Sequence, residues 1–272
     1  MYQTIYHRPT SLAEAARLFT SAGDAAYVSG GHTLLPAMKA RLASPSNLID
    51  LRHVAELKGV KVSGDALSIG AATTHFEVSD SREVKSAIPT LAALAGSIGD
   101  PQVRHLGTIG GSVANNDPAA DYPAAVLALA GTVHTDRRQI AADQFFTGLY
   151  TTALDEGEIV TRVAFRIPET CGYAKFRNPA SRYPMAGVFV ARHKDGSIRV
   201  GVTGAGNTGV FRWGEAERAL AGKFTADALK GLTVSTSGMM GDIHGSPEYR
   251  ANLVQVMARR ALENLGGAVA MV

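Results

Sequence analysis

Two short glycine loops are the parts of the sequence best suited to hold a charged ligand. They read Ser29-Gly30-Gly31-His32-Thr33 and Thr108-Ile109-Gly110-Gly111-Ser112. Glycine has no Cβ, so the backbone can approach a phosphate closely, and consecutive amides in a turn form a concave site for anions. One loop of this kind is more often a plain turn. Two such loops, each with hydroxyl side chains beside its glycines, favour a site for the diphosphate of a dinucleotide.

Both glycine loops are expected to follow strand-like residues. Residues 25–28 fit a short strand before the first loop, and residues 34–42 fit a helix after it. Thr108-Ile109 is the strand-sized segment before the second glycine pair. The recurrence of a strand followed by a glycine pair predicts one α/β lobe around each loop.

The remaining elements follow from periodicity and capping residues. We expect, in chain order, a helix over residues 11–21 with a capping box at Ser11 and Glu14, a strand over 48–51, a hairpin of 60–62 with 67–69, helices over 82–97 and 123–129, and a strand over 159–167. Pro168 marks a boundary. Beyond it we expect strands from 173 to 203 and then only helices, the last running from Ser246 to Gly266-Gly267.

Composition excludes several classes of protein. The 272 residues are 46% hydrophobic and 19% charged, which is typical of a soluble globular protein. The net charge is only +3, and the densest basic spots are the pairs Arg137-Arg138 and Arg259-Arg260, so no nucleic-acid partner is expected. The longest apolar stretch is too short for a membrane span, and the amino terminus lacks a leader pattern, so we expect a cytoplasmic protein. The single cysteine, Cys171, excludes a cysteine-ligated cluster held by this chain alone.

The sequence resembles a known family along nearly its whole length. The segments that carry the resemblance are Val28-Ser29-Gly30-Gly31-His32-Thr33-Leu34-Leu35-Pro36, Gly99-Asp100-Pro101-Gln102-Val103-Arg104, Gly107-Thr108-Ile109-Gly110-Gly111-Ser112 and Asn116-Asp117-Pro118-Ala119-Ala120-Asp121-Tyr122-Pro123. They are similar to the two FAD segments of the molybdenum hydroxylases, as found in the medium subunit of carbon monoxide dehydrogenase and the flavin domain of xanthine dehydrogenase. Residues 176–183 and 244–250 resemble the carboxy-terminal domain of that family.

The resemblance implies an α+β fold with two domains. The first would be a two-lobed FAD-binding domain of the PCMH (vanillyl-alcohol-oxidase-like) type over residues 1–170, with lobes at about 1–55 and 56–170. The second, over residues 171–272, would be a domain like that of the carbon monoxide dehydrogenase flavoprotein, with a small antiparallel sheet and a helix bundle.

The resemblance also implies an oxidoreductase subunit that transfers electrons. FAD on this chain would take electrons from 2Fe-2S clusters in a small iron-sulfur subunit and pass them to an external acceptor. A large molybdopterin subunit would hydroxylate the substrate, in a dimer of heterotrimers, and this chain would hold no metal and no catalytic residue. Two alternatives stay open: a stand-alone flavoprotein oxidoreductase with its own small-molecule substrate, and an assembly module that has lost the cofactor. The intact glycine pairs and Asp121 speak against the second alternative.

Site residues are carried over from the family position by position. The loop residues 30–33 and 110–112 would hold the diphosphate and ribityl parts, Asn115 and Asp121 would lie along the ribityl or flavin side, and Tyr183 would cover one face of the isoalloxazine. Arg177 stands where some relatives carry a lysine. The full set of expected cofactor-binding residues is Val28, Ser29, Gly30, Gly31, His32, Thr33, Leu34, Ile98, Gly99, Val103, Gly107, Thr108, Gly110, Gly111, Ser112, Ala114, Asn115, Asp121, Ile159, Val160, Arg177 and Tyr183.

One further motif favours a nucleotide site but lacks the right surroundings. The segment from Gly204 to Gly209 matches G-x-G-x-x-G. The strand before it, residues 198–203, alternates apolar and polar residues, whereas a central strand of a dinucleotide-binding parallel sheet is apolar throughout. The following helix is expected to begin only near Trp213, so no helix amino terminus faces this loop. We therefore expect an ordinary turn here, with Trp213 in the core.

Overall fold

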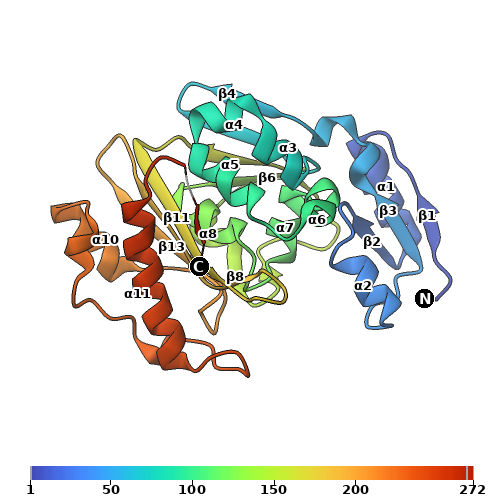
Figure 1. Ribbon diagram of the computed structural model, residues 1–272. Coiled ribbons are helices and arrows are strands. Elements are labelled where there is room, and N and C mark those ends of the chain that lie inside the picture. Colours follow the sequence, from blue (N-terminus) through green and yellow to red (C-terminus); the bar gives the residue numbers. More distant parts are fainter. Residues whose placement is uncertain (1, 268, 272) are drawn as a thin grey trace.

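The computed structural model describes residues 2–267 and 269–271, and the chain is built around three main sheets (Figure 1). The first sheet is parallel, with the strand order β1-β3-β2. Its elements are β1 (Ile5–His7), α1 (Leu12–Ala22), β2 (Ala25–Val28), α2 (Leu34–Lys39) and β3 (Asn47–Asp50), followed by the 3-10 turns η1 (Leu51–His53) and η2 (Ala55–Leu57). This small lobe has its own apolar core, which includes Ala15 and Ile49.

The second sheet is antiparallel, with the order β4-β5-β10-β6-β7. Its strands are β4 (Val60–Ser63), β5 (Ala66–Gly70), β6 (Thr132–Thr135), β7 (Gln139–Ala141) and β10 (Val160–Arg166). Between β5 and β6 the chain forms α3 (His75–Asp80), α4 (Arg82–Ala87), α5 (Pro89–Gly96), α6 (Pro101–Leu106), α7 (Ile109–Asn115) and α8 (Tyr122–Ala128). The short α9 (Ala142–Phe145) and the hairpin β8 (Phe146–Gly148) and β9 (Thr151–Thr152) complete this lobe.

The third sheet, in the carboxy-terminal part, has the order β14-β13-β12-β11-β15. Its strands are β11 (Thr170–Arg177), β12 (Pro184–Arg192), β13 (Ile198–Thr203), β14 (Phe211–Arg212) and β15 (Val269–Met271). The helices of this part are α10 (Gly214–Gly222) and α11 (Pro247–Glu263), with the 3-10 turns η3 (Ala226–Leu229) and η4 (Thr236–Gly238) between them. The α+β class expected from the sequence is confirmed.

Helix α8 joins the second lobe to the third sheet. Its residues share one apolar cluster with Tyr173 and Phe189 of the third sheet, while Ala174 and Val188, on the opposite face, pack with α11. The sheet is therefore covered by α8 on one face and α11 on the other, as the alternation of side chains along a strand requires. At Gly201 of β13 an added Cβ would lie 2.2 Å from the backbone oxygen of Ala124, so α8 rests directly on the strand backbone.

Several expected elements are confirmed in detail. Ser11 caps α1 by accepting a hydrogen bond from the amide of Glu14, and Ser246 caps α11 in the same way. Only half of the expected capping box at α1 forms, because the Glu14 carboxylate accepts from the amide of Thr10 instead. Trp213 lies in the core, as expected.

Three expectations about elements were wrong. The helix expected over residues 82–97 is two helices, because Pro89 cannot continue a helix and begins the second one at its first turn. Thr108 and Ile109 do not form a strand: Thr108 caps α7, and Gly110 and Gly111 lie in the first turn of that helix. The carboxy-terminal part does not end in helices alone, because α11 ends at Glu263 and β15 then pairs in parallel with β11.

The G-x-G-x-x-G segment is a loop between two antiparallel strands, β13 and β14. No parallel sheet surrounds it within the described residues, so the expectation of an ordinary turn agrees with the topology. The alternation of apolar and polar residues along β13 is typical of a strand with one exposed face. In the structure Gly201 is buried as well as Val200 and Val202, because α8 covers the face that read as polar.

We expect Gly201→Ala to lower the free energy of unfolding by about 1–3 kcal/mol, because the new methyl group overlaps the backbone of α8. The matched control is Gly222→Ala in α10, where an added Cβ meets nothing within 4 Å and stability should be unchanged or slightly higher. Urea unfolding of both variants measures the difference. Equal stabilities would contradict the close packing of α8 on β13.

Candidate functional site

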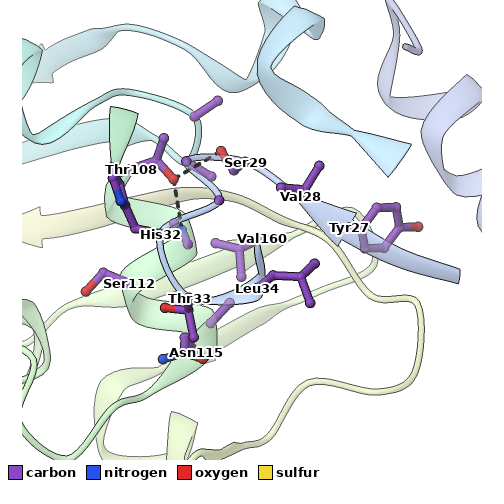
Figure 2. Close-up of a pocket in the computed structure, with 18 of the residues that line it drawn as sticks. Tyr27, Val28, Ser29, His32, Thr33, Leu34, Thr108, Ser112, Asn115 and Val160 are labelled. Atoms are coloured by element: carbon purple, nitrogen blue, oxygen red, sulfur yellow. Dashed lines mark hydrogen bonds between the residues drawn. The ribbon is translucent and has the colours of Figure 1, made fainter. Parts of the chain in front are cut away.

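A cavity of about 470 Å³ lies between the first lobe and the second, where the two glycine loops meet. Figure 2 shows the first loop passing beside α7, with Thr33 of the loop near Ser112 and Asn115 of the helix. All of the expected site residues line this cavity except Gly99 and Arg177. The lining residues that sequence reasoning missed are Ala26, Tyr27, Ala37, Leu51, Leu57, Ala71, Ala72, His75, Asp117, Ala120 and Glu158.

The two glycine loops touch each other. The hydroxyl of Thr108 donates a hydrogen bond to the hydroxyl of Ser29, at 3.1 Å (Figure 2). A Cβ on Gly30 would lie 2.4 Å from the backbone oxygen of Leu106 and 2.6 Å from the Cα of Gly107. Gly30 is therefore required by the contact between the loops themselves.

The first loop offers free backbone amides to the cavity. The amides of Gly30, Gly31, His32 and Thr33 donate no hydrogen bond to any described residue. Gly31 takes a left-handed conformation, with φ at +75°, which turns the chain into α2. Backbone donors need a partner, and amides that face a cavity find it in solvent or in an anionic ligand. This loop has the donors that a diphosphate needs.

The second loop, in contrast, has its amides already engaged. The amide of Gly110 donates to the Ala71 carbonyl at 2.9 Å, that of Gly111 to the Thr108 hydroxyl at 3.2 Å, and that of Ser112 to the Thr108 carbonyl at 3.0 Å. The loop therefore offers the side chains of Ser112 and Asn115, which have no described partner. At Gly111 an added Cβ would meet only the Thr108 hydroxyl, at 3.0 Å, so the space beside this residue is open.

The first-lobe part of the cavity is mainly apolar. Leu51, Leu57 and Ala72 line it together with Tyr27, whose ring stacks on Phe19 with centroids 4.8 Å apart. The Tyr27 hydroxyl donates to the carbonyl of Gly157. Burial raises the pKa of Tyr27 to about 12, so the phenol is neutral and presents a flat uncharged surface. Such a wall suits an aromatic ring rather than a charged group.

A buried charge pair lies at the part of the cavity near Tyr183. Asp121 lines the cavity but is only 4% exposed. Its Oδ1 accepts hydrogen bonds from the Tyr173 hydroxyl at 2.6 Å and from Nζ of Lys175 at 2.8 Å. Burial, with the nearby Asp121 charge, raises the pKa of Tyr173 well above its usual value, so the phenol stays a donor.

Sequence reasoning missed Lys175, although a signal was present. It is the one charged residue in the buried run of residues 171–175 of β11, and it is fully buried. A lysine at such a position needs a partner of opposite charge. The sequence does not say which carboxylate that is, because Asp121 lies 54 positions earlier in the chain.

Comparison with known proteins decides the family. Residues 1–170 match the family described as the FAD binding domain in molybdopterin dehydrogenase. The chain belongs to this family. It is 35% identical to the carbon monoxide dehydrogenase medium chain of Hydrogenophaga pseudoflava, over 94% of this chain and 95% of that one. It is 36% identical to the nicotine 6-hydroxylase medium subunit of Paenarthrobacter nicotinovorans, over 96% of each.

The solved structures agree in fold. A reconstituted CO dehydrogenase from Oligotropha carboxidovorans contains a chain that superposes with a TM-score of 0.87 at 33% identity, covering 97% of this chain and 98% of that one. The chain is accordingly an FAD-binding medium subunit of the molybdenum hydroxylase type and part of a multi-subunit oxidoreductase. The resemblance seen in the sequence is confirmed.

The cavity of this medium subunit fits FAD by its own chemistry. The unbonded amides of residues 30–33 suit the diphosphate, and Tyr27 offers a flat neutral wall for an aromatic ring. Within residues 2–267 and 269–271, no group of three or more His, Cys, Asp or Glu could hold a metal ion. In the same residues no helix is long and apolar enough to cross a membrane.

Two of the expected site residues, Arg177 and Gly99, lie outside the cavity lining, and Tyr183 lies at its exposed part. Arg177, at the end of β11, is exposed and does not line the cavity. Gly99 forms the left-handed turn before α6, and its carbonyl accepts hydrogen bonds from Arg104 and Arg182. Tyr183 lines the cavity and is 47% exposed, in the loop between β11 and β12. Burial and the Asp117 charge raise its pKa.

His75 forms part of the cavity wall as a neutral ring. Burial is the main cause that lowers its pKa to about 3, and the charges of His32 and Arg104 lower it further. Its Nδ1 has no hydrogen-bond partner among the described residues, and its ring lies 5.4 Å from that of Tyr122. This histidine is therefore not a proton donor near neutral pH.

We expect His75→Gln to flatten the acid side of the stability profile. Below pH 6.5 the unfolded chain binds a proton that the folded chain binds only near pH 3, so folding stability falls as the pH falls through this window. The slope contributed by His75 is at most about 1.4 kcal/mol per pH unit. Urea unfolding of both proteins between pH 7 and pH 5 measures it. Identical slopes would contradict a buried neutral ring.

Proposed function

We propose that this medium subunit carries electrons between two redox partners through an FAD bound across the two glycine loops. The FAD would be reduced by 2Fe-2S clusters of a small iron-sulfur subunit and reoxidised by an external acceptor. A large molybdopterin subunit would carry out the hydroxylation, and two such heterotrimers would form the complete enzyme. The supporting observation is the row of unbonded amides at residues 30–33, which face a cavity between two lobes.

We further propose that the two loops bind the FAD through different chemical groups. The first loop binds the diphosphate through its backbone amides, since these have no acceptor within the described residues. The second loop binds through the side chains of Ser112 and Asn115, and the bare backbone at Gly111 gives the ligand room to approach. The remaining expected residues, Gly99 and Arg177 apart, complete the walls.

The make-up of the site favours electron transfer over chemistry on a substrate. The sequence has one cysteine, Cys171, so the clusters that exchange electrons with this chain must be held by another polypeptide. His75 stays neutral in the wall, because burial lowers its pKa to about 3, so it does not serve as an acid near neutral pH. Relatives of similar length are named for carbon monoxide and for nicotine, which are chemically unlike. Such variety agrees with a substrate pocket on a different subunit.

The direct test is reconstitution of the purified chain with FAD. We expect one FAD per chain, measured from the flavin absorbance after gel filtration. No turnover of a small substrate is expected from the isolated chain, because electrons have no entry without the iron-sulfur partner. A chain that folds but does not retain FAD would contradict the proposal, and steady turnover by the chain alone would favour a stand-alone oxidoreductase.

The second loop has a sharper test in Gly111→Leu. The side chain would enter the open space beside Gly111, so we expect FAD binding to weaken by at least about 100-fold while the fold remains intact. The matched control is Gly222→Leu in α10, where an added Cβ meets nothing within 4 Å. Titration with FAD measures affinity, and circular dichroism reports the fold. Unchanged affinity in Gly111→Leu would place the ligand elsewhere.

A further inference from the structure

Lys175 is the one described lysine with no exposed surface, and its contacts join two walls of the cavity. Its Nζ donates to Oδ1 of Asp121 at 2.8 Å and to the carbonyl of Ser97 at 3.1 Å. Ser97 caps the end of α5 and precedes Ile98, which lines the cavity. A single ammonium group therefore fixes both the carboxylate and the segment that enters the wall beside it.

Among the described residues, hydrogen-bond donors reach only one of the two carboxylate oxygens of Asp121. Both donors, Tyr173 and Lys175, bond to Oδ1. Oδ2 accepts no hydrogen bond from a described residue, although the side chain is almost fully buried and lines the cavity. A carboxylate oxygen can accept hydrogen bonds, and Oδ2 keeps some accessible surface at the cavity rather than being sealed inside the protein. The vacant oxygen is thus suited to a donor on a ligand.

We propose that Lys175 is a positioning residue, which holds Asp121 in place so that Oδ2 takes a hydrogen bond from the imide N–H of the bound flavin ring. This inference rests on the proposed FAD site and deepens it. Ile98 and Tyr183, which line the same part of the cavity, offer the apolar and aromatic surface that a flavin ring needs.

The pair also sets the charge beside the ring. Lys175 and Asp121 together are neutral, so the flavin is next to a compensated pair. In a buried environment, removing one partner leaves an uncompensated charge with a strong local effect. Reduction adds negative charge to the flavin, so a lone carboxylate opposes reduction and a lone ammonium favours it.

The experiment compares Lys175→Met, Asp121→Asn and the double variant, each reconstituted with FAD. We expect the flavin midpoint potential to fall in Lys175→Met, to rise in Asp121→Asn, and to return towards the wild-type value in the double variant. FAD affinity should weaken about 10- to 100-fold in Lys175→Met, as for loss of a charged hydrogen bond. Lys194→Met is the matched control, because Lys194 pairs with Asp65 at the surface.

A modified ligand identifies the donor. 3-Methyl-FAD lacks the imide N–H, so we expect it to bind the wild-type chain about 10- to 100-fold more weakly than FAD. Asp121→Ala should bind the two ligands equally well. Discrimination of the same size in both proteins would overturn the proposed contact.

The outcomes separate this inference from the proposed function. A wild-type chain that does not bind FAD removes both. If FAD binds but the midpoint potentials of the two single variants shift in the same direction, or do not shift, only the role of Lys175 is overturned. The proposed function then stands. If Lys175→Met does not retain FAD, the double variant provides the test. We expect the double variant to bind FAD, because it no longer has an unpaired buried carboxylate. A double variant that folds but does not bind FAD overturns the inference.

Discussion

The site depends on the close contact between two glycine loops that come from different lobes. At Gly30 the backbone of the first loop lies so near Leu106 and Gly107 that no side chain fits between them, and the hydroxyls of Ser29 and Thr108 bond across the same junction. This contact holds the first lobe against the second and leaves the cavity beside it. The size of one residue thus controls how closely the two lobes approach.

The two loops look alike in sequence but have different physical roles. The first is an open turn whose amides are unused, whereas the second begins a helix whose amides bond to Ala71 and Thr108. Each loop has one glycine beside which no side chain fits: Gly30 against Leu106, and Gly110 against Ala71. Gly111 differs, because a Cβ there would meet only the Thr108 hydroxyl. Similar motifs can therefore place donors at one loop and room for a ligand at the other.

The buried pair of Asp121 and Lys175 ties the carboxy-terminal sheet to the cavity. Lys175 belongs to β11, yet it bonds to residues at the end of α5 and just before α8. Burying two charges is costly unless they are paired and hydrogen-bonded, which holds here for Oδ1 and for the ammonium. The third sheet accordingly supports the site, although among the described residues its strands line no part of the cavity and only Tyr183, in the loop between β11 and β12, does.

The family, the α+β class and most of the cavity lining were predictable from the amino-acid sequence alone, because these depend on local motifs with characteristic glycines and spacing. It also gave the helix caps at Ser11 and Ser246, which are local interactions. The pairing of β15 with β11 and the contact of Lys175 with Asp121 appeared only in three dimensions, because they join residues far apart in the chain and local propensity carries no information about such partners. The sequence prediction also missed the cap of α7 at Thr108, although it is a local hydrogen bond from the amide of Gly111.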